Sequence, residues 1–288
     1  MTAAEQIRDR LLRCEAENDF VIIYEGCVGS RLIGTYCLES DYDVRFVYVR
    51  PISQYLTTAA SAVKKTVSFR EILGDGTGID AQGYDVSHMI NLLSKGNVMM
   101  TEVMMSWLQF GVHPIMFGDA RQRLIDLATE PGKYASLAMH CLSIASGAIQ
   151  KMKEEPRIDH YLHAVRYILA AERIVHSLPW TSKTLPMILD RLYCTVGFGC
   201  LMPPECRDAV QKLIVSKTVT KQLTRRIEVI DDFVASAIPK LLAAASCLPK
   251  SVETPQHQCD ALFHRILGDV WGSWRPISYS KDVKPAGC

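Results

Sequence analysis

In the first hundred residues, some apolar residues follow the alternating spacing of strands and others the spacing of helices. Later in the chain, only the helical spacing is found. Residues 41–49 alternate between the two faces of a strand and are rich in β-branched and aromatic residues, so they predict a strand that Pro51 ends. Short apolar runs predict further strands at 20–24 and 79–84, and residues 63–69 form another strand or an edge strand. Strands and helices therefore mix in this part of the chain.

The first part also carries helical patterns. Residues 3–16 place Ile7, Leu11 and Leu12 on one face of an amphipathic helix. Residues 26–30 read as a turn, after which Ser30 caps a short helix. Further helices are expected at 52–61, 86–93 and after Asn97.

From about residue 119 onward, only the helical period remains. It predicts helices over residues 119–128, 134–153, 158–177, 183–194, 204–215 and 219–246. The residues after 248 contain four prolines together with Trp271 and Trp274. We expect these tryptophans to anchor the tail to the body or to offer a surface to a partner. The chain is thus an α+β protein: a mixed sheet with helices in residues 1–117, a helical domain in residues 118–248 and an accessory tail in residues 249–288.

Length, charge and cysteine content limit the class of protein but do not indicate a partner. With 288 residues, 48% of them hydrophobic and 22% charged, the chain can bury a core without disulfides. Its net charge of +1 gives no global attraction to nucleic acid or to an acidic membrane, although a local basic groove stays open. The ten cysteines form no CxxC pair and match no zinc spacing, which is typical of reduced thiols. With a polar N-terminus and no apolar run of membrane-spanning length, we expect a cytoplasmic protein with no membrane partner.

The candidate catalytic residues form a short motif, Gly29-Ser30 followed after ten intervening residues by Asp41-Tyr42-Asp43. A glycine lets the backbone approach a triphosphate closely, and a serine hydroxyl with free helix N–H groups donates to phosphate oxygens. Asp41 and Asp43 are two apart on a strand, so they point to the same face and repel each other unless a divalent cation is present. The alternative interpretation is a solvated strand end beside a capping serine.

These residues resemble the DNA polymerase β-type nucleotidyltransferase superfamily, whose signature is a Gly-Ser turn followed at this distance by Asp-x-Asp. Residues 29–34 and 40–48 look more narrowly like the predicted nucleotidyltransferases associated with RNA repair pathways, as do 83–86, 96–102 and 161–166. The chain departs from that family at Val98, where proline is usual, and at His160, where lysine is common.

The resemblance implies a nucleotidyltransferase-type sheet and an enzyme that transfers a nucleoside monophosphate from an NTP to a hydroxyl, with RNA ends as the favoured acceptor. Pyrophosphate would be released by a two-metal mechanism with Mg²⁺ or Mn²⁺. Two other functions stay open: a toxin-like nucleotidyltransferase that modifies protein or tRNA, and a non-catalytic nucleotide-binding scaffold. The oligomeric state is not predicted.

The superfamily also uses a third carboxylate, from a neighbouring strand. Asp80 lies in the strand expected at 79–84, whereas Asp85 directly precedes a helix and can be explained as its N-cap. We therefore predict that Asp41, Asp43 and Asp80 are the catalytic and metal-binding acids. Gly29, Ser30, Arg31 and Arg45 are the predicted nucleotide-binding residues, although either arginine could instead hold the acids in place.

Several other residues favour structural roles. Glu102 is expected to pair with another side chain, and Tyr161 to pack in a core, although the resemblance also allows Tyr161 and Arg166 to clamp a nucleotide. Lys217, Lys221, Arg225 and Arg226 recur at helical spacing and are interpreted as a solvated basic face rather than an RNA groove.

Overall fold

The computed structural model of the chain describes residues 1–38, 40–58, 64–106, 108–113, 117–176, 201–220, 222–223 and 225–272. Its strands are Val21–Val28 (β1), Tyr42–Val49 (β2), Thr66–Ile72 (β3) and Gly78–Asp85 (β4). Its helices are Ala3–Asn18 (α1), Gly29–Ile33 (α2), Ile52–Tyr55 (α3), Val86–Ser94 (α4), Val98–Met104 (α5), Gly118–Ala128 (α6), Pro131–Lys133 (η2, a 3₁₀ turn), Tyr134–Glu154 (α7), Ile158–Val175 (α8), Pro204–Ser216 (α10), Glu228–Ser246 (α11) and Gln256–Trp271 (α12).

The described strands form one mixed sheet in the order β1-β2-β4-β3. The two central strands, β2 and β4, are parallel, while β1 and β3 pair with them in antiparallel fashion. The mixed sheet and the helices that follow confirm the α+β class. Because β2 and β4 are neighbours, residues far apart in sequence lie side by side in the middle of the sheet.

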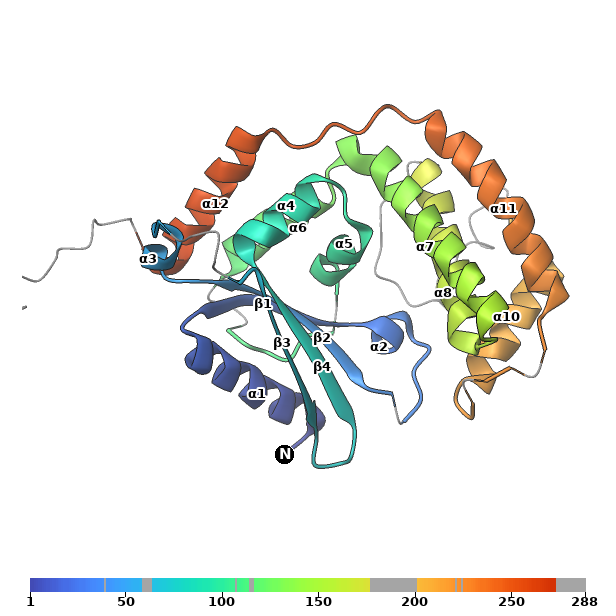
Figure 1. Cartoon of the computed structure of the whole chain (residues 1–288), viewed down its shortest axis with the longest axis horizontal. Helices are drawn as coiled ribbons and strands as arrows, with labels where there is room; N and C mark the ends of the chain where they lie inside the picture. Colours follow the sequence, from blue (N-terminus) through green and yellow to red (C-terminus); the bar gives the residue numbers. More distant parts are fainter. Residues whose placement is uncertain are drawn as a thin grey trace, which may run out of the picture.

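One face of the sheet is covered by α1 (Figure 1). Ile7 and Leu11 of α1 are buried there in one cluster with Phe46 and Tyr48 of β2. The predicted apolar face of α1 is therefore confirmed for these two residues, but Leu12 is 36% exposed. This packing explains the alternating apolar residues of β2, because its even-numbered side chains point toward the face that α1 covers.

The opposite face divides into an apolar half and a polar half. Val47 and Val49 of β2 and Tyr84 of β4 join the cluster formed with α4, α5 and α6. Helix α12 packs against α4 and α6, reached by a connection that runs back over the molecule (Figure 1). Trp271 donates from Nε1 to the carbonyl oxygen of Arg50 at 3.0 Å, which agrees with the expected anchoring role; Trp274 lies outside the described residues.

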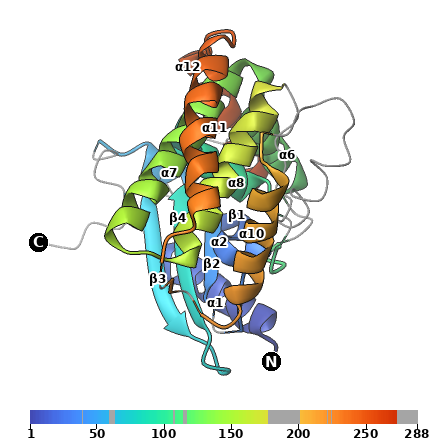
Figure 2. The same cartoon turned by 90° about the vertical axis from the view of Figure 1, so that its right-hand side faces the viewer.

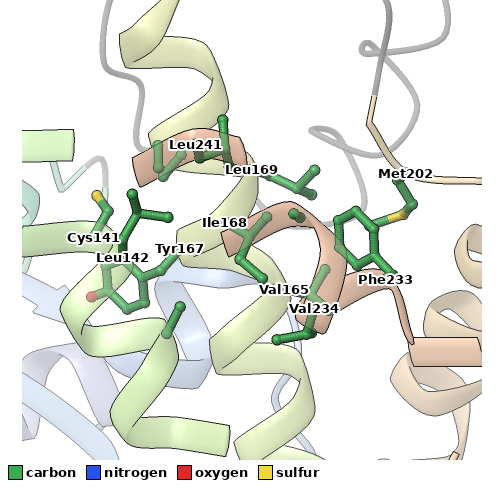
Figure 3. Close-up of a cluster of buried hydrophobic side chains, with 14 of the residues drawn as sticks. Cys141, Leu142, Val165, Tyr167, Ile168, Leu169, Met202, Phe233, Val234 and Leu241 are labelled. Atoms are coloured by element: carbon green, nitrogen blue, oxygen red, sulfur yellow. The ribbon is translucent and has the colours of Figure 1, made fainter. Parts of the chain in front are cut away.

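A second group of helices stands beside the sheet. Figure 2 shows α7, α8, α10 and α11 next to one another, and α8 contacts each of the other three. Their shared core is drawn in Figure 3, where Val165, Ile168 and Leu169 of α8 face Phe233 and Leu241 of α11. Most residues of α8 are buried, because it lies between its neighbours and the sheet side of the molecule.

The boundaries depart from the sequence prediction in several places, and the helix expected at 52–61 already ends at Tyr55. Strand β1 continues through Val28, so residues 26–28 are not part of a turn. Ser30 does not cap α2, because the helix begins at Gly29 and Val28 is its N-cap. Helix α11 begins at Glu228 rather than at residue 219, since the backbone at Gln222 forms a β-bridge with Arg157 instead. The helix predicted at 183–194 lies outside the described residues.

Candidate active site

The strand register brings two of the predicted acids together. Asp43 on β2 pairs directly with Asp80 on β4, and Asp41 immediately precedes β2. Val28, the last residue of β1, pairs with Asp43 from the other side, so the turn into α2 begins beside this carboxylate. Alternation along the strands places Asp41, Asp43 and Asp80 on the same, polar half of the sheet face.

Gly29 occupies a position that only glycine suits. Its φ of +65° lies in the left-handed region, and a Cβ atom there would collide with the carboxylate of Asp43. Gly78 plays a matching role at the start of β4, because a Cβ would meet Oδ1 of Asp41 at 2.5 Å. Both glycines let the backbone lie closely against the acids. This leaves the N–H groups of the short helix α2 next to the carboxylates.

The acids are crowded. Burial raises the pKa of Asp43; Arg45 opposes this shift, while Asp80 and Asp41 add to it. Arg45 does not neutralise the pair tightly, since its guanidinium nitrogens lie 3.9 Å from Oδ1 of Asp43 and 4.0 Å from Oδ1 of Asp80. Its Nη1 instead donates to the carbonyl oxygen of Asp80 at 2.9 Å, so Arg45 fixes β2 against β4 at the cavity wall.

Arg31, the other predicted nucleotide-binding arginine, is directed elsewhere. Its guanidinium donates to the carbonyl oxygens of Ser40 and Asp41, with Nε–O distances of 3.2 and 3.3 Å. It also lies over the ring of Tyr42, 3.7 Å from the ring centre. These contacts hold the loop that leads to the acids, and the role of Arg31 in nucleotide binding stays a prediction.

Asp80 and Asp85 lie at opposite ends of β4 and have different surroundings. Asp85 is buried and caps α4, accepting from the backbone N–H of Ser87 at 2.9 Å and from the hydroxyl of Tyr55 at 2.8 Å. Asp80 faces the cavity with Asp43, and its other contact is the exposed Arg70 at 3.0 Å. The geometry therefore agrees with the capping argument for Asp85, while the catalytic role of Asp80 stays a prediction.

A cavity of about 450 Å³ lies between this part of the sheet and the second group of helices. We call the side formed by Gly29, Ser30, Asp41, Asp43, Arg45 and Asp80 the sheet wall. The opposite side, formed by Asp159, Leu162, His163, Arg166 and Tyr167 of α8 and by Lys217 after α10, is the helical wall. Of the predicted site residues, only Arg31 does not line this cavity.

Lys217 is the functional candidate that sequence reasoning misinterpreted. It is 5% exposed rather than solvated, and its Nζ lies 2.5 Å from Oδ1 of Asp159 and 3.4 Å from the hydroxyl of Thr35. Burial alone would raise the pKa of Asp159, but Lys217 and Arg157 lower it. Lys217 also lowers the pKa of Asp43 across the cavity. The sequence offers no signal for this pairing, because Asp159 belongs to a different helix.

His160, where the family commonly has a lysine, is directed away from these groups. Its Nδ1 lies 3.1 Å from the carbonyl oxygen of Glu155, and the residue does not line the cavity.

A buried ion pair joins α5 to the helical wall. Nη1 of Arg166 on α8 lies 2.6 Å from Oε1 of Glu102 on α5, and the hydroxyl of Tyr167 donates to Oε2 of Glu102 at 2.9 Å. Burial alone would lower the pKa of Arg166, but Glu102 and Tyr167 raise it above its ordinary value. The expected pairing of Glu102 is thus present. Tyr161, in turn, is fully buried, and its hydroxyl donates to Asp231 at 3.0 Å.

The donors of the sheet wall suit a hard divalent cation. Carboxylate oxygens are the ligands that Mg²⁺ and Mn²⁺ prefer. Within the described ranges, no three His, Cys, Asp or Glu side chains come together as a ready-made metal cluster. Mg²⁺ usually binds one or two protein carboxylates and completes its shell with water and substrate phosphates. The residues therefore fit an ion that Asp41 and Asp43 would share with a bound triphosphate.

A mixed sheet that presents paired aspartates beside a glycine-serine turn defines the class of DNA polymerase β-type nucleotidyltransferases. A family model described as the RNA repair pathway DNA polymerase beta family matches residues 3–265, and the chain belongs to this family. It is also 24% identical over 278 residues to the uncharacterized protein YcgL of Bacillus subtilis (strain 168). That alignment covers 93% of this chain and 97% of the relative. None of the helices in the described part of the chain has the length and apolar character to cross a bilayer.

Proposed function

We propose that the protein transfers a nucleoside monophosphate from an NTP to a hydroxyl acceptor, with an RNA end as the favoured acceptor, and releases pyrophosphate. The observation that carries this proposal is the register pair Asp43 and Asp80, which lines one cavity with Asp41 and the Gly29-Ser30 turn. The RNA acceptor rests on the family's association with RNA repair.

Each residue of the cavity has a task in this reaction. The N–H groups at the start of α2 and the hydroxyl of Ser30 would donate to phosphate oxygens, while Lys217 would offset their charge from the opposite wall. The acceptor oxygen attacks the α-phosphorus, the bond from the α-phosphorus to the bridging oxygen breaks, and pyrophosphate leaves. Asp80 would take the proton of the acceptor hydroxyl or help to hold a cation beside it. A divalent cation held by Asp41 and Asp43 would stabilise the charge that develops on the attacking and leaving oxygens.

The test is incubation with NTPs labelled at the α-phosphate, with cellular RNA and with cellular protein in parallel. We expect label in the RNA fraction, and only with Mg²⁺ or Mn²⁺ present. Label in the protein fraction alone would redirect the proposal to protein modification. Titration calorimetry provides a second measurement, because equal NTP affinity in EDTA and in Mg²⁺ would contradict a role for the acids in holding a metal ion.

The pair of variants Asp80→Asn and Asp85→Asn tests the third acid. We expect Asp80→Asn to lose transfer while keeping its melting temperature, because Asp80 touches only cavity and surface groups. Asp85→Asn should melt earlier but transfer label once folded, because Asp85 caps α4 away from the cavity. Reversed results would assign the catalytic role to Asp85.

A further inference from the structure

The cavity has two chemically different ends. The sheet wall carries the acids and Ser30, whereas the end between α5 and α8 combines the paired Glu102 and Arg166 with apolar and aromatic side chains, which are Met99, Met100, Val103, Leu162, His163 and Tyr167. We call this second set the α5–α8 end. Met100, Val103 and Leu162 are nearly fully buried and form its floor, while Met99 is 54% exposed. A charged phosphate gains nothing at such a surface, but a flat apolar ring system does.

Helix α8 connects the two ends of the cavity. Asp159, which holds the Nζ of Lys217, and His163 are four residues apart and lie on the same side of the helix. They are separated by about 6 Å along the helix axis, because each residue rises about 1.5 Å. A triphosphate placed between Ser30 and Lys217 would therefore direct its nucleoside along α8 toward His163.

His163 has the shape and charge state that suit a neutral ligand. Its ring stands edge-on to that of Tyr167, with ring centres 4.8 Å apart and an interplanar angle of 75°. The side chain stays exposed but lies in a concave surface, where burial and the nearby Arg166 and Lys151 lower its pKa to about 4. At neutral pH, His163 is therefore an uncharged aromatic ring with one hydrogen-bond donor and one acceptor.

The acceptor has another route to the acids. Strand β3 is the edge of the sheet, and Thr66, Ser68 and Arg70 on its cavity-side face are exposed. Arg70 is 84% exposed in its side chain and lies beside Asp80, the predicted base. An acceptor strand can therefore reach Asp80 over β3, which leaves the α5–α8 end for the nucleotide that is transferred.

We propose that the α5–α8 end binds the base of the NTP, and that His163 is the side chain on which this base stacks. This inference rests on the proposed function, since it places the nucleoside relative to the triphosphate site. Met99 and Tyr167 flank the base, and Tyr167 is held in place by its hydrogen bond to Glu102. Stacking on an aromatic side chain tolerates different bases, so a ring at position 163 matters more than its hydrogen bonds.

The experiment compares two probes, an NTP and inorganic tripolyphosphate, by calorimetry with Mg²⁺ present. His163→Ala should weaken NTP binding about 10-fold, in the range of one lost stacking contact, and should leave tripolyphosphate binding unchanged. His163→Phe should bind NTP nearly as well as the wild type, whereas His163→Gln should resemble His163→Ala. His160→Ala is the matched control, because His160 is on the same helix but does not line the cavity and should alter neither affinity.

Three results would overturn the inference. Equal losses of NTP and tripolyphosphate affinity in His163→Ala would place His163 at the phosphates instead. Unchanged NTP affinity combined with a raised KM for the acceptor would place the acceptor at the α5–α8 end. A wild type that binds neither probe would overturn the proposed function itself, and a melting curve for each variant separates these outcomes from misfolding.

Discussion

The two walls of the cavity are built in different ways. The sheet wall is a product of backbone register, because hydrogen bonding between β2 and β4 alone places Asp43 next to Asp80. The helical wall is a product of side-chain packing, because Lys217 reaches the cavity only where α10 ends against Asp159 of α8. Residues 29–43 of the sheet wall are close in sequence, whereas Asp80 joins them only through strand pairing and the helical wall depends on the packing of several helices.

The walls also treat charge differently. On the sheet wall, Asp43 has only the distant Arg45, 3.9 Å away, and the cationic partner of Asp80 at short range is the exposed Arg70, at 3.0 Å. The helical wall pairs each of its cations at short range, Lys217 with Asp159 and Arg166 with Glu102. The negative charge of Asp43 is thus only weakly offset by nearby side chains, whereas the cations of the helical wall are paired within the fold.

The largest expected effect concerns the ion pair between Glu102 of α5 and Arg166 of the helical wall. Glu102→Gln should reduce the free energy of unfolding by about 3–5 kcal/mol, because it leaves the buried guanidinium of Arg166 without its counter-charge. Denaturant unfolding measures this change. The control is Glu17→Gln, which breaks a pair with Arg10 at the surface and should cost less than about 1 kcal/mol. Similar small changes in both variants would show that this buried pair does not stabilise the contact between α5 and the helical wall.

The next effect tests the sheet wall. Asp43→Asn should slow transfer at least ~100-fold, the order seen when one preorganised electrostatic partner is removed. Folding should survive, and without metal the variant should be as stable as the wild type or slightly more so, because repulsion from Asp41 and Asp80 is relieved. Single-turnover transfer and a thermal melt on one preparation measure both quantities. A folded variant with near-normal transfer would move the chemistry away from the sheet wall.

A smaller effect is expected at Lys217. Lys217→Met should weaken tripolyphosphate binding about 10-fold, because one charge-assisted hydrogen bond contributes about 1.5–3 kcal/mol. Calorimetry with Mg²⁺ measures the affinity. Lys240→Met on the exposed side of α11 removes the same charge far from the cavity and serves as the control. If both substitutions change the affinity equally, Lys217 acts only through the overall charge of the protein.

The smallest effect is a pH dependence of stability. His163 has a pKa of about 4 in the folded protein and about 6.5 when unfolded, so the unfolded chain binds more protons between these values. The contribution to stability is fully present above pH 6.5 and is lost as the pH falls toward 4. His163→Gln should therefore show a shallower decrease in unfolding free energy between pH 7 and pH 5 than the wild type. Parallel curves in urea titrations would mean that His163 titrates normally.

The sequence predicted the parts of the structure that local patterns determine. The strand at 41–49, the strand at 79–84 and most helices agree with the structure within a few residues, because their periodicity reports directly on burial. The start of α11 was predicted nine residues too early, since the pattern cannot show that Gln222 pairs with Arg157. The interpretation of Lys217 as part of a solvated basic face was wrong for a related reason, because its partner Asp159 lies on a different helix.

The candidate site follows the same division. Gly29, Ser30, Asp41 and Asp43 form one short motif, so the sequence alone brings them together. The N-cap role of Asp85 was also accessible, because an N-cap has a local signature, while the catalytic role of Asp80 stays a prediction. Arg166 was named only through resemblance and His163 was given no role, since neither charge nor spacing shows that α8 faces the acids. Their roles in nucleotide binding remain predictions.

The position of α12 has a practical consequence for anyone who shortens this protein. A chain cut after residue 248 would lose the side chains of Cys259, Ile266 and Leu267, all of which are buried in one cluster with α4 and α6. The surface thus uncovered includes Met89, Ile90 and Leu124, which would face water and favour aggregation. Helix α12 therefore covers the core formed with α4 and α6, and the C-terminal boundary of an expressed fragment should lie beyond Trp271.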